Sequence, residues 1–137
     1  MCSSDLPLTR EQSDAVVGRI RTHFAVHGYG LWAVEAEGAF AGFTGLAWSD
    51  VTGERALEVG WRFATAYWGR GYAAEAARAA LDVGLRQAPE VVSFTALTNT
   101  ASERVMQRLG MRRVREFDNP RPDLPDRLRR HVLYATP

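Results

Sequence analysis

The stretch that decides the fold is EVGWRFATAYWGRGYAA, residues 58–74. Its first residues alternate large apolar side chains with small or charged ones, which is the period of a β-strand. From Gly71 onward small residues recur at helical spacing, so a helix is predicted to begin there. The first amide N–H groups of a helix are unpaired and lie at its positive dipole end. A glycine-rich turn at this point therefore favours a phosphate or pyrophosphate site, with a purely structural turn as the alternative.

Two common phosphate-binding motifs are absent, because the turn has neither the lysine-hydroxyl ending of a P-loop nor the three spaced glycines of a dinucleotide fingerprint. The turn resembles the acetyl-CoA pyrophosphate loop of the GNAT superfamily, Gln/Arg-x-x-Gly-x-Gly/Ala. Gly71 and Ala73 occupy its last two defined positions, whereas Trp68 stands where Gln or Arg is usual. That departure is typical of the ribosomal-protein N-acetyltransferases of the RimJ/RimL type, whose loop commonly reads Tyr-Trp-Gly-Lys/Arg-Gly-Tyr-Ala and then Glu-Ala.

Three further motifs support this resemblance in the expected order. They are similar to the fourth strand, the Asn-x-x-Ser … Leu-Gly-Phe helix and the closing strand of the RimJ/RimL branch. The matching residues are Glu58-Val59-Gly60-Trp61, Asn99-x-x-Ser102 with Leu109-Gly110-Met111, and His131-Val132-Leu133-Tyr134. The resemblance covers roughly residues 8 to 135.

Working outward from the loop, the periodicity predicts a helix, three strands, a helix, a strand, a helix and two strands. The expected ranges are 9–27, 30–36, 39–48, 55–63, 71–87, 91–97, 100–110, 111–117 and 128–135. Thr9 with Gln12, and Thr100 with Glu103, have the spacing of capping boxes. This order indicates one α/β or α+β domain, residues 1–137, and the resemblance implies a mixed, mostly antiparallel, splayed sheet with helices on both faces.

The first residues depart from the family pattern. Members of the family normally have a strand and a helix before the element predicted at Thr9–His27. Residues Cys2-Ser3-Ser4-Asp5-Leu6 also match what a common sequencing adapter would encode in one frame. We expect that the domain is truncated at its N-terminus, and that residues 1–7 are non-native or disordered.

Composition excludes several classes of protein. Of 137 residues, 46% are hydrophobic, and 17 basic residues nearly balance 16 acidic ones, so no electrostatic footprint for nucleic acid or an anionic membrane is expected. Cys2 is the only cysteine, and the three histidines lack metal-ligand spacing, so no disulfide and no metal are expected. No apolar run reaches the ~18 residues of a membrane span. We expect a cytoplasmic monomer or homodimer.

Acetyl transfer from a thioester to an amine needs a proton acceptor for the amine, a donor for the oxyanion and help for the leaving thiolate. Glu58 is the candidate proton acceptor, directly or through water, because it lies beside Gly60 in an otherwise apolar strand. In GNAT enzymes a glutamate on this strand often has this role. A solvated residue or a partner of Arg62 is the alternative interpretation.

Ser102 is the candidate for meeting the departing thiolate. Many GNAT enzymes use a tyrosine seven residues after the asparagine, but that position is Met106 here. RimJ/RimL-type enzymes place a serine three residues after the asparagine, as this chain does. An ordinary serine in a first helical turn is equally compatible with the sequence, and Asn99 is expected either to bind cofactor or to cap its helix.

The resemblance also implies a binding site for acetyl-CoA, the co-substrate. Main-chain groups of Trp61, Arg62 and Phe63 would pair with the pantetheine arm, and one of them would meet the oxyanion. The side chains of Trp61 and Phe63 are expected in the core. The remaining predicted cofactor-binding residues are Trp68, Gly69, Arg70, Gly71, Tyr72, Ala73 and Asn99, of which Trp68 and Tyr72 are favoured as packing beneath the loop.

The function predicted from the sequence is N-acetyl transfer from acetyl-CoA to a primary amine, with a protein N-terminal α-amino group as the first candidate. Acetylation of a small-molecule amine, such as an aminoglycoside or a polyamine, is the nearest alternative. A non-catalytic acyl-CoA-binding domain and a plain interaction domain are the alternatives from other classes.

Overall fold

The computed structural model describes residues 8–137, so the expectations for Cys2 and for residues 1–7 fall outside it. The order of elements agrees with the sequence prediction. The helices are α1 (Arg10–His27), α2 (Tyr72–Gln87) and α3 (Thr100–Arg108), with short 3₁₀ turns at Thr65–Tyr67 (η1) and Asp126–Leu128 (η2). The strands are β1 (Leu31–Ala36), β2 (Ala39–Ser49), β3 (Ala56–Phe63), β4 (Val91–Ala96), β5 (Arg112–Asp118) and β6 (Arg130–Ala135).

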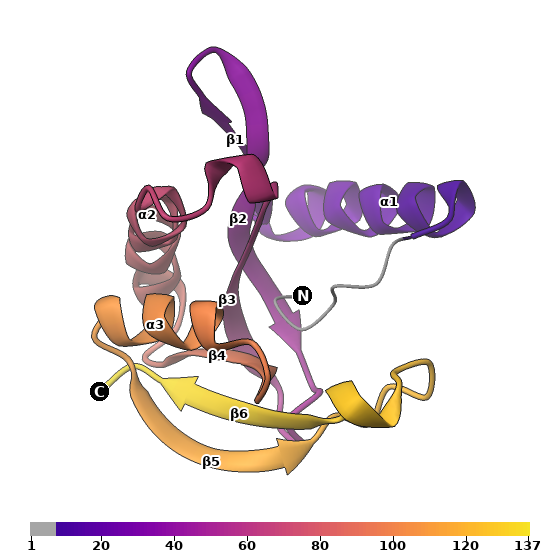
Figure 1. Cartoon of the computed structure of the whole chain (residues 1–137), viewed down its shortest axis with the longest axis vertical. Helices are drawn as coiled ribbons and strands as arrows, with labels where there is room; N and C mark the ends of the chain where they lie inside the picture. The colour runs from indigo at the N-terminus through magenta and orange to yellow at the C-terminus, as the bar shows by residue number, and fades with distance from the viewer. Residues whose placement is uncertain (1–7) are drawn as a thin grey trace.

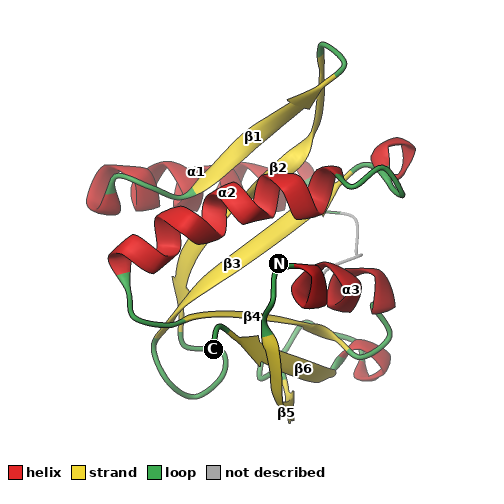
Figure 2. Ribbon diagram, turned by 90° about the vertical axis from the view of Figure 1, so that its left-hand side faces the viewer, coloured by secondary structure: helices red, strands yellow, loops and turns green. Residues whose placement is uncertain are grey.

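The six strands form one mixed sheet in the order β1-β2-β3-β4-β6-β5. Only β3 and β4 run parallel, because α2 connects them, and all other neighbours are antiparallel. Figures 1 and 2 show α2 and α3 on one side of the sheet and α1 on the other. The predicted fold class, a mostly antiparallel open sheet with helices on both faces, is therefore confirmed. No helix within residues 8–137 is long and apolar enough to cross a membrane.

The sheet opens between its two central strands. β3 and β4 pair only at Leu57–Val91 and Glu58–Val92, after which the strands separate. At the point of separation the Ser93 hydroxyl donates a 2.9 Å hydrogen bond to the Val59 carbonyl, in place of a backbone partner. This side-chain bond satisfies a buried acceptor at the start of the gap.

The helix α2 packs closely on the sheet because its inner face consists of small residues, as predicted. Ala77, Ala80, Leu81 and Gly84 are buried. A Cβ on Gly84 would come within 2.8 Å of Leu46 and 3.1 Å of Val91, so the helix and the sheet are in direct contact at this glycine.

The capping box predicted at Thr9 is confirmed, because Thr9 and Gln12 exchange both hydrogen bonds, and Gly28 ends α1 with a φ of 79°. The capping box predicted at Thr100 is wrong. Asn99 caps α3 instead, and its side chain accepts from the Ser102 N–H at 3.2 Å. Of the three residues that the helical spacing predicts on the inward face, Leu109 is buried, Val105 is half-buried and Ala101 is exposed. The residues of α3 and its C-cap that are buried are Ser102, Met106 and Leu109.

Gly45 provides a test of how closely β1 and β2 approach. A Cβ at this position would overlap the Gly30 carbonyl oxygen and lie 2.7 Å from the Leu31 Cα. We expect Gly45→Ala to lower the free energy of unfolding by about 2–3 kcal/mol, since the backbone of β1 would have to shift. Urea denaturation measures the effect, and Gly18→Ala is the control. Gly18 lies within α1, and none of the described residues comes within 4 Å of its Cβ position, so that change should be neutral or stabilising by about 0.5–1 kcal/mol.

Candidate functional site

The turn between β3 and α2 has the conformation that its glycines permit. Gly69 and Gly71 have φ values of 74° and 80°, in the left-handed region. Among residues 8–137, no hydrogen bond engages the N–H groups of Gly69, Arg70 or Gly71. The following N–H groups, at the start of α2, have no acceptor within the helix and no capping side chain in the described part of the chain. The turn therefore presents a run of unpaired donors at a helix N-terminus, which is an arrangement suited to a diphosphate.

Two side chains hold this turn against the rest of the sheet. The Trp68 indole is 60% exposed, but its Nε1 donates a 2.8 Å hydrogen bond to the Phe63 carbonyl. Arg70 forms a 2.9 Å ion pair with Glu37 in the β1–β2 turn and lies over the Tyr67 ring at 6.0 Å. Because both partners of the ion pair are well exposed, the pair contributes only about 0–1 kcal/mol, and Arg70 is able to turn to an anion instead.

The main chain of β3 presents hydrogen-bonding groups to the gap at alternate residues. Ala64 donates to Ala41 in β2, whereas the Val59 carbonyl faces β4 and accepts from Ser93. Since backbone groups alternate along a strand, Trp61 and Phe63 direct theirs towards the gap. Arg62 lies opposite Phe43 in β2, and its main-chain groups point there, unlike the expectation from sequence. The side chains of Trp61 and Phe63 are buried in the core, as predicted.

Glu58 occupies the last paired position before the gap. Its side chain points away from α2, because its neighbour Leu57 pairs with Val91, which touches Gly84 of that helix. The residue is 5% exposed, and Oε2 is shielded from solvent without a hydrogen-bond partner among residues 8–137. Burial raises the pKa of the carboxyl above its usual range. A buried carboxyl without a partner is costly to the fold, which makes it a candidate functional group.

Asn99 and Ser102 lie together at the start of α3. The Asn99 side chain caps this helix, and Ser102 is 7% exposed in its first turn. The position of α3 is fixed at its other end by Arg78 of α2, whose guanidinium donates to the carbonyls of Arg108 at 2.8 Å and Leu109 at 3.3 Å. Both helices that flank the gap are therefore joined to each other by this arginine.

Comparison with known proteins identifies the domain. The family model for the acetyltransferase (GNAT) domain matches residues 2–112. The chain belongs to the GNAT acetyltransferase family. A relative, the uncharacterised protein YkkB of Bacillus subtilis (strain 168), is 36% identical over 101 residues, covering 69% of this chain and 59% of its own. The FsC-acetyl coenzyme A-N(2)-transacetylase of Aspergillus fumigatus is 32% identical over 114 residues, covering 74% of this chain and 48% of its own. The chain thus spans about half to three fifths of these relatives.

Solved GNAT structures share the fold over nearly the whole chain. A GnaT-family acetyltransferase from Bordetella pertussis superposes with a TM-score of 0.78 at 25% identity, covering 95% of this chain and 78% of that one. RimL, the ribosomal L7/L12 α-N-protein acetyltransferase solved with coenzyme A, has a TM-score of 0.75 at 17% identity, covering 98% of this GNAT chain and 77% of that one. At this identity the second likeness concerns the fold alone.

Other contacts at the site are not apparent from the sequence. The Ser93 hydroxyl donates to the Val59 carbonyl, and the Thr44 hydroxyl donates to the Gly60 carbonyl. Neither Ser93 nor Thr44 belongs to a sequence motif that would predict its contact. His131 is fully buried, with both ring nitrogens in hydrogen-bonding contact. Its contact with Asn119 could not be predicted from the sequence, because it joins the two ends of a loop. Among residues 8–137, no three His, Cys, Asp or Glu side chains are grouped as metal ligands.

Proposed function

We propose that this GNAT domain transfers an acetyl group from acetyl-CoA to a primary amine, with Glu58 as the general base. The observation that carries the proposal is the buried Glu58 carboxyl, whose Oε2 has no hydrogen-bond partner among residues 8–137 and which lies where the sheet opens. Because burial raises the pKa of this carboxyl, its ionised form is a stronger base than an exposed glutamate and takes a proton from an amine more readily. A carboxylate with only a structural role would be paired with a cation or with N–H donors.

Acetyl-CoA is proposed to lie across the gap, with its diphosphate on the unpaired N–H groups from Gly69 to Ala73 and with Arg70 beside it. Tyr72 and Ala73 contribute their main chain there, and Trp68 fixes the turn. The pantetheine arm would pair with the main chain of Trp61 and with the N–H of Phe63, whose carbonyl already accepts from Trp68, in the manner of an added strand. Arg62 would then take part through its half-buried side chain.

The proposed reaction is a direct attack. The amine loses a proton to Glu58, directly or through water, and its nitrogen bonds to the thioester carbonyl carbon. The Trp61 N–H is the proposed donor to the oxyanion. As the carbon–sulfur bond breaks, the thiolate accepts a hydrogen bond or proton from Ser102, whose hydroxyl regains a proton from solvent. Asn99 positions Ser102 through the cap of α3.

The proposed acceptor is the α-amino group of a protein N-terminus, as in the RimJ/RimL branch that the loop sequence resembles. An α-amino group has a pKa near ~8 and is more easily deprotonated than a lysine or polyamine nitrogen, whose pKa is near ~10. A small-molecule amine remains the second candidate, since the spermidine N-acetyltransferase SpeG chimera shares this fold with a TM-score of 0.66 at 15% identity.

Release of free thiol from acetyl-CoA tests the reaction and the acceptor together. The panel contains peptides with free N-terminal alanine or serine, the same peptides N-acetylated, spermidine and an aminoglycoside. We expect turnover with the free peptides only. Turnover with spermidine or the aminoglycoside alone would move the acceptor to the small-molecule class. Binding of acetyl-CoA without any turnover would indicate a non-catalytic acyl-CoA-binding domain. The absence of a thermal shift with coenzyme A would contradict both the acetyltransferase and the acyl-CoA-binding domain.

A further inference from the structure

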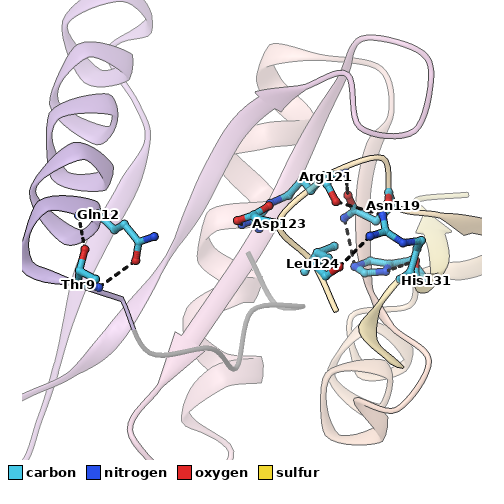
Figure 3. A network of polar contacts seen from close by, with 8 residues as sticks. Thr9, Gln12, Asn119, Arg121, Asp123, Leu124 and His131 are labelled. Carbon is cyan, nitrogen blue, oxygen red and sulfur yellow. Dashed lines mark hydrogen bonds and ion pairs between the residues drawn. The ribbon is translucent and has the colours of Figure 1, made fainter. Parts of the chain in front are cut away.

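The loop between β5 and β6, residues 119–129, is a closed ring with its own core. The Asn119 N–H donates to the Arg129 carbonyl at 2.8 Å, which closes the neck of the loop. Inside the ring the Arg129 guanidinium donates to the carbonyls of Asn119, Arg121 and Leu124, at 2.9, 3.1 and 2.7 Å. Figure 3 shows part of this network. Compact loops with adjoining ends, packed by their own side chains, are often functional.

This loop lies on the side of the sheet that presents Glu58. Glu58 pairs with Val92, and side chains at every second residue of β4 share that face. Ala96 is one of them, and the buried Leu124 and Leu128 of the loop pack against it. Because β3 and β4 separate beyond Val92, Ala96 marks the wide end of the gap. The loop is therefore placed to form a wall for a molecule that approaches Glu58 from the side away from α2.

His131 holds the base of the loop, and its contacts require one protonation state. Asn119 Oδ1 accepts from the Arg121 N–H at 3.0 Å, so Nδ2 faces His131 Nε2 at 3.3 Å. Nε2 must therefore accept, and the ring proton is on Nδ1, 3.1 Å from the Arg129 carbonyl. An imidazolium donates from both nitrogens and would place an N–H against the Asn119 amide N–H group. The network thus accommodates only the neutral ring.

We propose that His131 is a positioning residue: its neutral ring fixes the 119–129 loop beside the gap, and a proton on the ring releases the loop and weakens binding of the amine acceptor. The acceptor part of this inference rests on the proposed function. The loop itself does not depend on catalysis and can be tested without substrate.

The surroundings of His131 disfavour its charged form. Two aromatic rings flank it, Phe94 of β4 at 6.2 Å and Phe117 of β5 at 5.6 Å. Burial lowers the pKa of His131, the Arg129 carbonyl opposes this, and the charge of Arg121 lowers the pKa further. The nearby charges on the adjoining elements are paired with one another: Arg121 with Asp123, Arg129 with Asp126, and Arg130 with Glu116 and Asp118. Because the closed loop binds this proton more weakly than the open loop does, acidification favours opening.

Amide hydrogen exchange on the substrate-free protein tests the release. After correction for intrinsic rates, exchange within residues 119–129 should be faster near pH 5 than near pH 7.5, because the pKa of His131 is lowered in the closed loop and the open loop therefore takes up the proton first. His131→Gln keeps one donor and one acceptor without titrating, so its loop should exchange equally at both pH values. His27→Gln is the matched control and should behave as the wild type. Equal exchange at both pH values in the wild type would overturn the proposal.

Asn119→Asp supplies the opposite test. A carboxylate can accept from both the Arg121 N–H and an imidazolium, so the His131 pKa, followed by the NMR signals of its ring, should rise by about one unit or more. The loop should then stay protected on acidification. A His131 pKa that does not move, or a loop that still opens, would contradict the assigned contacts.

Kinetics connect the loop to the acceptor. On acidification the wild-type KM for the acceptor should rise more than that of His131→Gln, while the affinity for acetyl-CoA stays equal in the two proteins. Identical acceptor KM profiles would overturn the role in acceptor binding. If no acceptor supports turnover at all, the proposed reaction fails, and the exchange experiment still decides the role of His131 in the loop.

Discussion

Replacing Glu58 with glutamine should lower kcat/KM for acetyl transfer by about 10²–10⁴-fold, the usual contribution of a general base. Glutamine has nearly the same shape but cannot take a proton from the amine. Thiol release under single-turnover conditions measures the chemical step. In the wild type this step should accelerate with rising pH as the Glu58 carboxyl, with its raised pKa, loses its proton. The variant should lose that limb of the pH profile.

Binding of acetyl-CoA is the control for this variant, because Glu58 lies on the side of β3 that faces away from α2. Calorimetry should give the same dissociation constant within about twofold. Glu54→Gln, at an exposed turn residue that precedes β3, is the matched substitution and should leave turnover unchanged. Unchanged turnover in Glu58→Gln would remove Glu58 from the mechanism.

The same variant should also alter how stability depends on pH. Burial raises the pKa of Glu58, so the folded protein keeps this proton to a higher pH than the unfolded chain does. The wild type therefore loses stability as pH rises from the unfolded pKa through the folded one. Between about pH 5 and pH 8, the melting temperature of Glu58→Gln should fall less than that of the wild type. A parallel fall in both proteins would show that the carboxyl is not desolvated.

Gly71→Ala should weaken the binding of acetyl-CoA by about tenfold, since a left-handed φ costs an alanine about 1–2 kcal/mol. The φ of Gly71 is 80°, and a change in this angle would redirect the adjacent unpaired N–H groups. Calorimetry with acetyl-CoA measures the loss of affinity. The strain should also lower the free energy of unfolding by a similar amount.

Gly28→Ala is the matched control for this prediction. Gly28 has a φ of 79°, and neither Gly28 nor Gly71 has a contact from residues 8–137 within 4 Å of its Cβ position. It ends α1, away from the turn. Both variants should lose comparable stability, but only Gly71→Ala should lose affinity for acetyl-CoA. An equal change of affinity in the two variants would mean that the turn does not hold the diphosphate.

Sequence patterns correctly predicted the features that are formed by residues close to one another in the chain. The Thr9 cap, the Gly28 stop and the strand-to-helix turn each involve residues within four positions of one another, and all three are present. The α3 cap was misplaced because Asn99 and Thr100 are adjacent and both are good capping residues. Glu58 was predicted as a candidate proton acceptor from its apolar neighbours, but its burial and the lack of a partner for Oε2 among residues 8–137 depend on strands that are distant in sequence.

Contacts between distant residues account for what the sequence did not reveal. Arg78 of α2 contacts carbonyls 30 and 31 residues away at the end of α3. Ser93 reaches Val59 across 34 residues, and Asn119 reaches His131 around a loop. Such pairs have no periodicity within a short window, so a single sequence gives no signal for them.

The brief contact between β3 and β4 divides the sheet into two three-stranded halves, β1-β2-β3 and β4-β6-β5, joined by two residue pairs. A ligand bound in the gap between β3 and β4 would contact both halves and link them to each other. Its binding would therefore stabilise the whole domain against unfolding, because only the folded domain presents both sides of the gap. The protein should accordingly be mechanically weakest along the line where its chemistry is proposed to occur.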